Sequence, residues 1–199
     1  MGRPPSFDER RVLKGAMHAF WRQGYHATSL KDLEQATGLT TGSLYNAFHS
    51  KDQLFAAALS HYIENIIRWR IDHYLGDSSP ALEGIRQFLR STVIGVPEAQ
   101  QGLACLLVNT AVELGRTNAL AGPLIEHGLG QIRDGFAAQL ERARTAGEIR
   151  PDVDCAVAAC QLTLLLSGLL VASRTAADPQ TLAACIDMTL AALRPSRGS

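Results

Sequence analysis

The sequence has no net charge, because its 19 Lys and Arg residues balance 19 Asp and Glu residues. The molecule as a whole therefore has no long-range attraction to nucleic acid or to an anionic membrane. The charge is nevertheless uneven along the chain. Residues 1–51 contain seven Lys or Arg and four Asp or Glu, a surplus of +3, and the remainder contains twelve against fifteen, or −3. A partner with phosphate groups is therefore expected to bind the first segment.

Long apolar runs and metal-binding motifs are also missing. The N-terminus lacks the apolar stretch of a secretion signal, and the apolar segment 156–172 is interrupted by Gln161, Thr163 and Ser167. We therefore expect a soluble, cytoplasmic protein without membrane contact. The four cysteines show no CxxC or Cys/His spacing, so we expect free thiols, no metal site and no cofactor.

Catalytic motifs are absent as well. The sequence has no supported Ser/His/Asp constellation, glycine-rich phosphate loop or HExxH motif, and its six histidines are scattered. We therefore do not expect an enzyme. A helical enzyme that uses the Cys105 thiol is the alternative, and turnover of an electrophile would distinguish it from a protein that is only modified stoichiometrically.

Two-residue alternation is missing too, and every periodic segment has the spacing of an α-helix. The sequence therefore predicts an all-α protein of about nine helices, with Ser6 as the first N-cap. We expect two domains, 1–52 and 53–199. The predicted helices span residues 7–23, 30–36, 41–47, 51–75, 80–94, 102–115, 119–146, 153–175 and 179–193.

The segment TTGSLYNAFHSKDQL, residues 40–54, contains small residues at a predicted helix start. At 100° per residue, Leu44 and Phe48 share one face, which is expected to pack on the preceding helix. Gly42 and Asn46 lie on the opposite face, which is therefore small and able to hydrogen-bond. Two short helices joined by a Gly-containing turn form a helix-turn-helix, whose second helix enters the major groove of DNA.

Helix N-termini in this region offer hydroxyl and backbone N–H groups, which bind phosphates without many lysines. The alternative interpretation is that the Ser and Thr residues are ordinary caps and that Tyr45 is an aromatic side chain at the edge of the core. The candidate phosphate-binding residues are Thr28, Ser29, Thr40, Thr41, Tyr45, His49 and Lys51.

The stretch ATSLKDLEQATGLTTGSLYNAFHSKDQL resembles the DNA-binding segment of the TetR family of transcriptional regulators. The resemblance covers residues 7–54 and departs from the family at Thr37. It implies an N-terminal three-helix helix-turn-helix domain followed by a helical ligand-binding and dimerisation domain. It implies phosphate contacts for Thr28, Tyr45 and Lys51, base-edge contacts for Thr41, Gly42, Ser43 and Asn46, and a minor-groove contact for Arg3.

A single recognition helix reads few base pairs, so a homodimer on double-stranded operator DNA is expected. Helix 119–146 has internal glycines at 128, 130 and 135, which indicate close backbone approach. Helix 153–175 is apolar nearly all round. We predict that these two helices form the dimer interface, and the alternative is that both are interior helices of a monomer.

The segment GLACLLVNTAVELGR has a polar stripe on a helix that is otherwise apolar. Cys105, Asn109, Glu113 and Arg116 form this stripe, which needs a polar partner, a cavity or a ligand. The segment also resembles a TetR subgroup that includes electrophile- and oxidant-responsive repressors with a modified cysteine at this place. A buried structural Cys105 is the alternative. The other cysteines, Cys155, Cys160 and Cys185, are expected to be core residues.

These features predict a TetR-type regulator, by resemblance a repressor, that is released from its operator by a small-molecule effector or by modification of Cys105. A DNA-binding architectural protein without sequence choice is disfavoured by the absent net charge. The candidate effector or sensor residues are Trp69, His73, Phe88, Cys105, Asn109 and Glu113.

Overall fold

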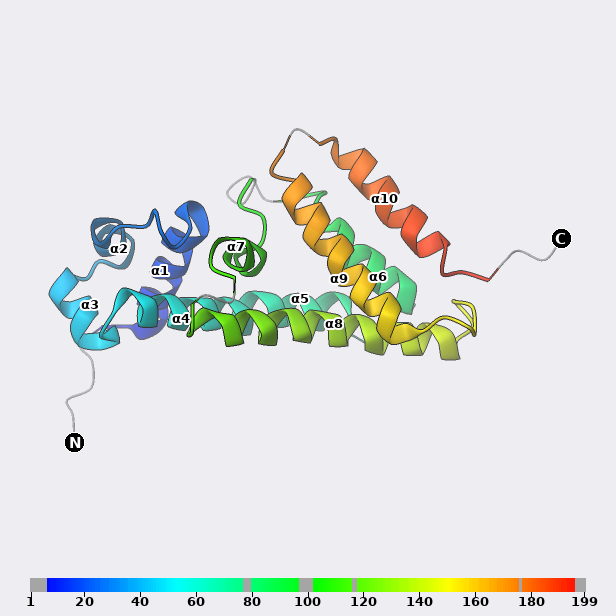
Figure 1. Ribbon diagram of the computed structural model, residues 1–199, viewed down its shortest axis with the longest axis horizontal. Helices are drawn as coiled ribbons and strands as arrows, with labels where there is room; N and C mark the ends of the chain where they lie inside the picture. Colours follow the sequence, from blue (N-terminus) through cyan, green and yellow to red (C-terminus); the bar gives the residue numbers. More distant parts are fainter. Residues whose placement is uncertain (1–6, 77–79, 97–101, 116–117, 176, 196–199) are drawn as a thin grey trace. The chain divides into compact units, whose positions relative to one another are not determined.

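The structure of the protein is a computed structural model, and every regular element in its described part is helical (Figure 1). This confirms the all-α prediction. The described residues form ten α-helices, and the π-helix η1 joins α4 to α5 without a break. Nine separate helical stretches therefore result in this part of the chain. The described residues are 7–76, 80–96, 102–115, 118–175 and 177–195.

The helices belong to two compact units. Unit 1 comprises Met1–Ile66 and Cys105–Gly128, and unit 2 comprises Ile67–Ala104 and Leu129–Ser199. Unit 1 is therefore larger than the predicted domain 1–52 and is built from two stretches of chain. The helices are α1 (Glu9–Gln23), α2 (Leu30–Thr37), α3 (Thr41–Phe48), α4 (Lys51–Tyr62), η1 (Ile63–Ile67), α5 (Arg68–Tyr74), α6 (Ala81–Arg90), α7 (Leu106–Glu113), α8 (Ala121–Thr145), α9 (Cys155–Ala172) and α10 (Pro179–Ala191).

Helices α1, α2 and α3 form the headpiece, whose helix starts follow local capping signals. Asp8, rather than the predicted Ser6, is the N-cap of α1, because its carboxylate accepts the backbone N–H groups of Arg10 and Arg11. Ser6 lies outside the described residues. Ser29 begins α2 with a capping box that its side chain forms with Asp32.

The headpiece is held by a small aromatic and aliphatic core. Phe20 of α1 packs edge-on against Phe55 of α4, with ring centroids 4.9 Å apart, and Leu33 of α2 is fully buried. Helices α1 and α2 approach closely at Gly15. A Cβ atom at this position would lie 2.2 Å from the backbone oxygen of Ala36, so no side chain larger than hydrogen fits.

The glycines of α8 serve packing within the chain. In unit 1, a Cβ on Gly128 would lie 2.8 Å from a methyl carbon of Leu107 and 3.2 Å from one of Ile63. In unit 2, a Cβ on Gly135 would lie 3.0 Å from Leu75. The predicted close approach is therefore present at these two positions, but the neighbours are helices of the same chain.

Unit 2 has its own core and polar links. Phe88 of α6 packs edge-on against Phe136 of α8, with centroids 5.2 Å apart. Arg90 of α6 pairs with Asp187 of α10 at 3.1 Å. Helix α10 is therefore attached to α6 by a half-exposed ion pair as well as by its buried apolar residues.

Candidate DNA-binding surface

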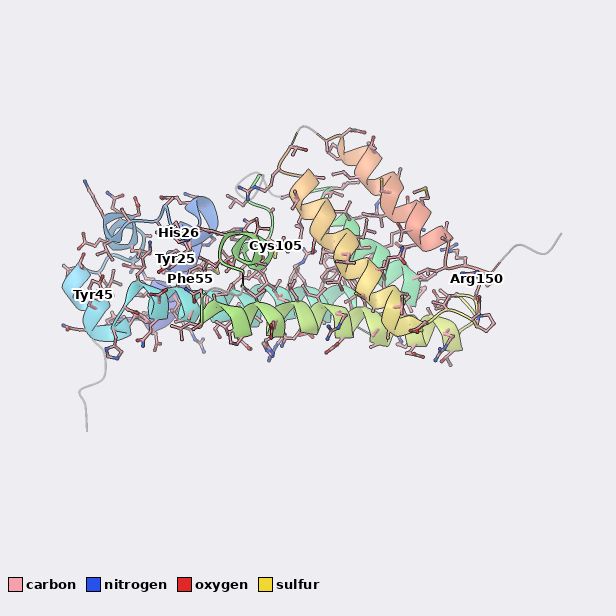
Figure 2. All side chains as sticks on the ribbon, viewed as in Figure 1. Tyr25, His26, Tyr45, Phe55, Cys105 and Arg150 are labelled. Carbon is pink, nitrogen blue, oxygen red and sulfur yellow. The ribbon has the colours of Figure 1, made fainter. Side chains whose placement is uncertain are left out.

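Helix α3 has the two faces that the sequence predicts. Leu44 is 3% exposed and Phe48 is half-buried, so both lie on the inner face. Gly42 and Asn46 are exposed, and a Cβ on Gly42 would meet no atom within 4 Å. Tyr45 is also exposed and lies on α3 away from α7 (Figure 2). The outer face of α3 is therefore free to approach another surface closely.

The N-terminus of α3 is occupied by a carboxylate that sequence reasoning did not identify. The Glu34 Oε1 atom accepts the backbone N–H of Thr41 at 2.5 Å and the Thr41 hydroxyl at 2.7 Å. These hydrogen bonds hold the pKa of Glu34 below its usual value. The Thr40 hydroxyl accepts the Ser43 backbone N–H at 3.3 Å. The Thr41 N–H and hydroxyl, which were predicted to bind phosphate, are therefore already bound to a carboxylate in this structure.

The start of α2 is similarly satisfied. The Ser29 hydroxyl and backbone N–H both donate to the Asp32 carboxylate, at 2.5 Å and 2.8 Å, and hydrogen bonds from the Ser29 side chain and backbone lower the pKa of Asp32. Thr28 is 0% exposed and its hydroxyl donates to the Gly24 carbonyl at 2.5 Å. The Thr28 hydroxyl therefore braces the turn between α1 and α2, and a phosphate contact from Thr28 stays a prediction.

Lys51 lies at the first turn of α4, where Ser50 is the N-cap. Its ammonium group lies 4.5 Å from the centre of the Tyr25 ring, which favours a cation in this position. The Tyr25 hydroxyl donates to Asp52 at 2.8 Å. Burial, followed by this hydrogen bond, raises the pKa of Tyr25 to about 12, so the phenol remains a donor at neutral pH.

His49 ends α3 in a backbone conformation that few non-glycine residues adopt. Its φ is +63°, its backbone N–H donates to the Tyr45 carbonyl at 2.8 Å, and its side chain is exposed. The conformation turns the chain between α3 and α4. Arg3, the predicted minor-groove residue, lies outside the described residues.

Glu113, at the end of α7, binds the headpiece. Its carboxylate accepts the backbone N–H groups of Tyr25 at 2.9 Å and His26 at 2.7 Å, and Figure 2 shows both residues beside α7. Gly24 has a φ of +82°, and a Cβ there would lie 2.7 Å from the Glu113 carboxylate. The Glu113 carboxylate, predicted to line an effector cavity, therefore has a partner within the protein. Its partner is a turn of the same unit.

Cys105 is the N-cap of α7 and is 8% exposed. The predicted helix 102–115 starts later, at Leu106, because Gly102 and Ala104 have positive φ angles. The Tyr62 hydroxyl donates to the Cys105 sulfur at 3.4 Å. Asn109 is half-buried one turn further along α7, and Arg116 lies outside the described residues.

The other cysteines differ in exposure. All four are free thiols. Cys155 is buried as predicted, and burial raises its pKa, so its thiol is a poor nucleophile. Cys185 is half-buried. The core prediction is wrong for Cys160, which is exposed on α9 because the apolar surface of that helix extends beyond its buried side.

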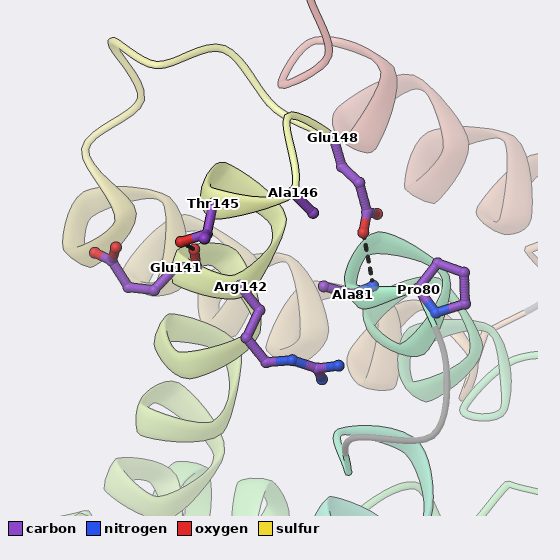
Figure 3. Close-up of a pocket in the computed structure, with 7 residues that line it drawn as sticks. All are labelled: Pro80, Ala81, Glu141, Arg142, Thr145, Ala146 and Glu148. Atoms are coloured by element: carbon purple, nitrogen blue, oxygen red, sulfur yellow. Dashed lines mark hydrogen bonds between the residues drawn. The ribbon is translucent and has the colours of Figure 1, made fainter.

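The remaining predicted effector residues lie in unit 2, where they differ in burial. Trp69 and His73 stack on each other at 4.8 Å on the exposed side of α5, and Phe88 is a fully buried core residue. A surface pocket of about 460 Å³ lies elsewhere in unit 2 (Figure 3). Its lining residues are Pro80, Ala81, Glu141, Arg142, Thr145, Ala146 and Glu148.

The pocket in Figure 3 has a structural explanation. The Glu148 carboxylate accepts the backbone N–H groups of Ala81 and Leu82, both at 3.1 Å, and so caps the start of α6. Arg142 donates to the Gly76 carbonyl at 3.3 Å. Among the described residues, no cluster of three or more His, Cys, Asp or Glu side chains is placed to hold a metal ion.

Unpartnered apolar side chains gather on α9 and α10. Val157, Leu164 and Val171 of α9 are exposed at helical spacing, and Met188 of α10 is exposed too. The apolar positions of α8 are instead mostly covered by its own chain, and its exposed residues include the pair Arg133 and Asp134. Helix 119–146 therefore does not offer the predicted apolar dimer surface.

Helix α9 is also long and apolar enough to cross a membrane by length and composition, with 39% of it buried. An apolar core or interface helix satisfies the same criterion, so this property does not indicate a membrane span.

A headpiece with a crossed pair of short helices, followed by a larger helical part, defines the class of helix-turn-helix DNA-binding regulators. Residues 12–58 match the family model of bacterial regulatory proteins of the tetR family, and residues 81–189 match the tetracyclin repressor-like C-terminal domain. The chain belongs to the TetR family of DNA-binding transcriptional regulators. Proteins of this family are regulators rather than enzymes, in agreement with the prediction.

Full-length relatives share this organisation. The uncharacterized regulator YezE of Bacillus subtilis is 29% identical over 97% of this chain and 100% of its own. The repressor Rv1474c of Mycobacterium tuberculosis is 29% identical over 94% of this chain and 93% of its own. A cysteine mutant of the TetR-family regulator CifR, complexed with 26-bp double-strand operator DNA, is 30% identical with a TM-score of 0.80, over 96% of this chain and 99% of its own.

Proposed function

We propose that the chain is a cytoplasmic repressor that binds double-stranded operator DNA as a homodimer, with α3 of each subunit in the major groove. The observation that carries this proposal is the outer face of α3, where Gly42, Tyr45 and Asn46 are exposed above a buried Leu44. Lys51, placed beside the Tyr25 ring, supplies a phosphate contact. Relatives named as repressors, such as Rv1474c, and the CifR complex with operator DNA support it.

Three single variants test the groove assignment on an operator selected from random duplexes. Lys51→Ala and Tyr45→Ala should weaken binding to all sequences, and Lys51→Ala should also lower the slope of log affinity against log salt by about 1. Asn46→Ala should reduce discrimination at one base pair by roughly 1–3 kcal/mol, because an amide pairs bidentately with adenine. Mobility-shift titrations at several salt concentrations measure both effects.

Arg194→Ala is the control, since it removes one exposed positive charge from unit 2. It should leave affinity and salt dependence unchanged. If all three headpiece variants bound the operator as the wild type does, α3 would not be the reading helix.

The homodimer is proposed to form through α9 and α10. The exposed apolar side chains on these helices need a covering surface, and a second copy provides one with the same composition. This replaces the pair of helices predicted from sequence, because α9 is retained and α8 is not. Two subunits present two recognition helices, and these match the two half-sites of a palindromic operator.

We further propose that α7 connects an effector event to the headpiece. Cys105 lies at one end of this eight-residue helix and Glu113, bound to the Tyr25 and His26 N–H groups, lies at the other. At 1.5 Å per residue the two ends are about 12 Å apart. Modification of Cys105, or an effector that displaces α7, would loosen the Glu113 contacts and favour a state with lower operator affinity.

Cys105→Ser tests the thiol branch of this proposal. Wild-type protein bound to its operator should dissociate when treated with an electrophile such as N-ethylmaleimide, and the serine variant should remain bound because a hydroxyl is not alkylated. Release is measured by fluorescence anisotropy of labelled DNA, with mass spectrometry to locate the adduct. Cys160→Ser, which removes the α9 thiol that is exposed in the single chain, is the matched control and should still be released. Equal release of the Cys105→Ser complex would eliminate Cys105 as the sensor.

A further inference from the structure

The hydroxyl of Thr41 has a fixed hydrogen-bonding polarity. A threonine hydroxyl has one proton to donate and two lone pairs to accept. In this structure the proton is directed at the Glu34 Oε1 atom, 2.7 Å away, and the Thr41 backbone N–H binds the same atom at 2.5 Å. Both donors of Thr41 are therefore engaged within the headpiece.

The direction of this hydrogen bond follows from the charge of its partner. The hydrogen bonds from Thr41 hold the pKa of Glu34 below its usual value, so the carboxylate is ionised at neutral pH. An ionised carboxylate only accepts, which makes Thr41 the donor. The neighbouring Thr40 and Ser43 hydroxyls, 3.0 Å apart, differ in this respect, because either one can be the donor.

We propose that Glu34 is a specificity-positioning residue, which makes Thr41 an acceptor that recognises an exocyclic amino group in the major groove. The proposal rests on the insertion of α3 described under Proposed function. In the major groove the base-edge donors are the adenine N6 and cytosine N4 amino groups. Guanine O6 and N7, thymine O4 and phosphate oxygens only accept, so Thr41 does not bind them while its proton is held by Glu34.

The negative charge of Glu34 also favours base contact over phosphate contact at Thr41. Its carboxylate lies at the N-terminus of α3, where it satisfies the helix dipole that would otherwise attract a phosphate. Thr41 is therefore directed to bases, and phosphate contacts are left to groups such as Lys51. Glu34 on α2 therefore determines which base Thr41, the first residue of α3, recognises.

Four variants, each tested against all four base pairs at every operator position, examine this assignment. Wild type should prefer an amine-bearing base at one position of each half-site, and Thr41→Val should lose that preference. Replacing the base there by its amine-free analogue, purine for adenine or 2-pyrimidinone for cytosine, should weaken wild-type binding about 3- to 10-fold, as expected for one hydrogen bond. Thr41→Val should respond to the analogue by less than about 2-fold.

The Glu34 variants separate positioning from stability. Glu34→Gln retains a side-chain oxygen acceptor and should keep the preference. Glu34→Ala frees the Thr41 proton, so the same position should accept guanine or thymine as well. Glu9→Ala removes an exposed carboxylate from α1 and controls for the loss of one negative charge. Thermal melting confirms that each variant is folded, and a folded Glu34→Ala protein with the wild-type base preference would overturn the proposal.

The role of Glu34 and the insertion of α3 are rejected by different results. If Asn46→Ala and Tyr45→Ala weaken binding but Glu34→Ala and Thr41→Val leave every base preference unchanged, only the role of Glu34 is rejected. If none of the α3 variants changes operator binding, the insertion of α3 is rejected, and the role of Glu34 with it.

Discussion

Gly15→Ala should destabilise the headpiece and abolish operator binding. The added Cβ would lie 2.2 Å from the backbone oxygen and 2.9 Å from the backbone carbon of Ala36. These atoms belong to α2 and cannot rotate away as a side chain does, so α1 and α2 must separate. Overpacking typically costs about 1–3 kcal/mol and occasionally more, and a clash between backbones belongs at the upper end. Such a loss is a large part of the roughly 5–15 kcal/mol that stabilises a domain. Urea denaturation and operator titration measure the two effects.

Gly42→Ala is the matched control, with a predicted effect of opposite sign on stability. No atom lies within 4 Å of a Cβ at this exposed helix position, so alanine should stabilise α3 by about 0.5–1 kcal/mol. Operator binding should nevertheless weaken, because the new methyl group occupies space proposed to face the groove. A Gly15→Ala protein as stable as wild type would show that α1 and α2 are not packed as described. Unchanged DNA binding by Gly42→Ala would place this face outside the groove.

Leu164→Glu should convert the homodimer to monomers and reduce operator affinity by at least two orders of magnitude. Leu164 is 69% exposed in the single chain and lies between Val157 and Val171 on the outer face of α9. In the proposed dimer a glutamate would be buried without a partner, at a cost of several kcal/mol in each subunit. A monomer contacts one half-site, so the affinity gained by joining two binding modules is lost as well. Analytical ultracentrifugation and operator titration measure both consequences.

Ala138→Glu provides the comparison for this variant. Ala138 is exposed on α8, the helix that the sequence pattern assigned to the dimer interface. The substitution should leave the protein dimeric, because this side of α8 is already polar. Monomers with Ala138→Glu and dimers with Leu164→Glu would reverse the assignment of the interface.

Features that depend on neighbouring residues were predictable from the sequence. The capping box at Ser29, the cap at Ser50 and the inner and outer faces of α3 each follow from residues within about two helical turns. The same locality explains why the all-α class and the number of helical stretches were confirmed. The first helix was predicted correctly, but its start was not, because Asp8 caps the helix in place of Ser6.

Contacts between different helices and turns were not predictable in this way, even where, as for Glu34 and Thr41, the residues are only seven apart. Glu34 binds Thr41 across a turn, and Glu113 binds a headpiece turn 87 and 88 residues earlier in the chain. Spacing on one helix marked Glu113 as a polar residue that needs a partner, but it could not say whether that partner is protein or ligand. For the same reason the glycines of α8 indicated close packing without identifying the neighbour, which is the same chain.

The attachment of α7 to the headpiece is chemically asymmetric. Tyr25 and His26 contribute only main-chain N–H groups, whereas α7 contributes the single carboxylate of Glu113. Substitutions other than proline at positions 25 and 26 leave these donors in place, but replacing Glu113 by a residue without a side-chain acceptor removes the partner of both. In the proposed mechanism, evolution can therefore change the response to an effector through α7 alone, while the proposed DNA-binding surface is inherited unchanged.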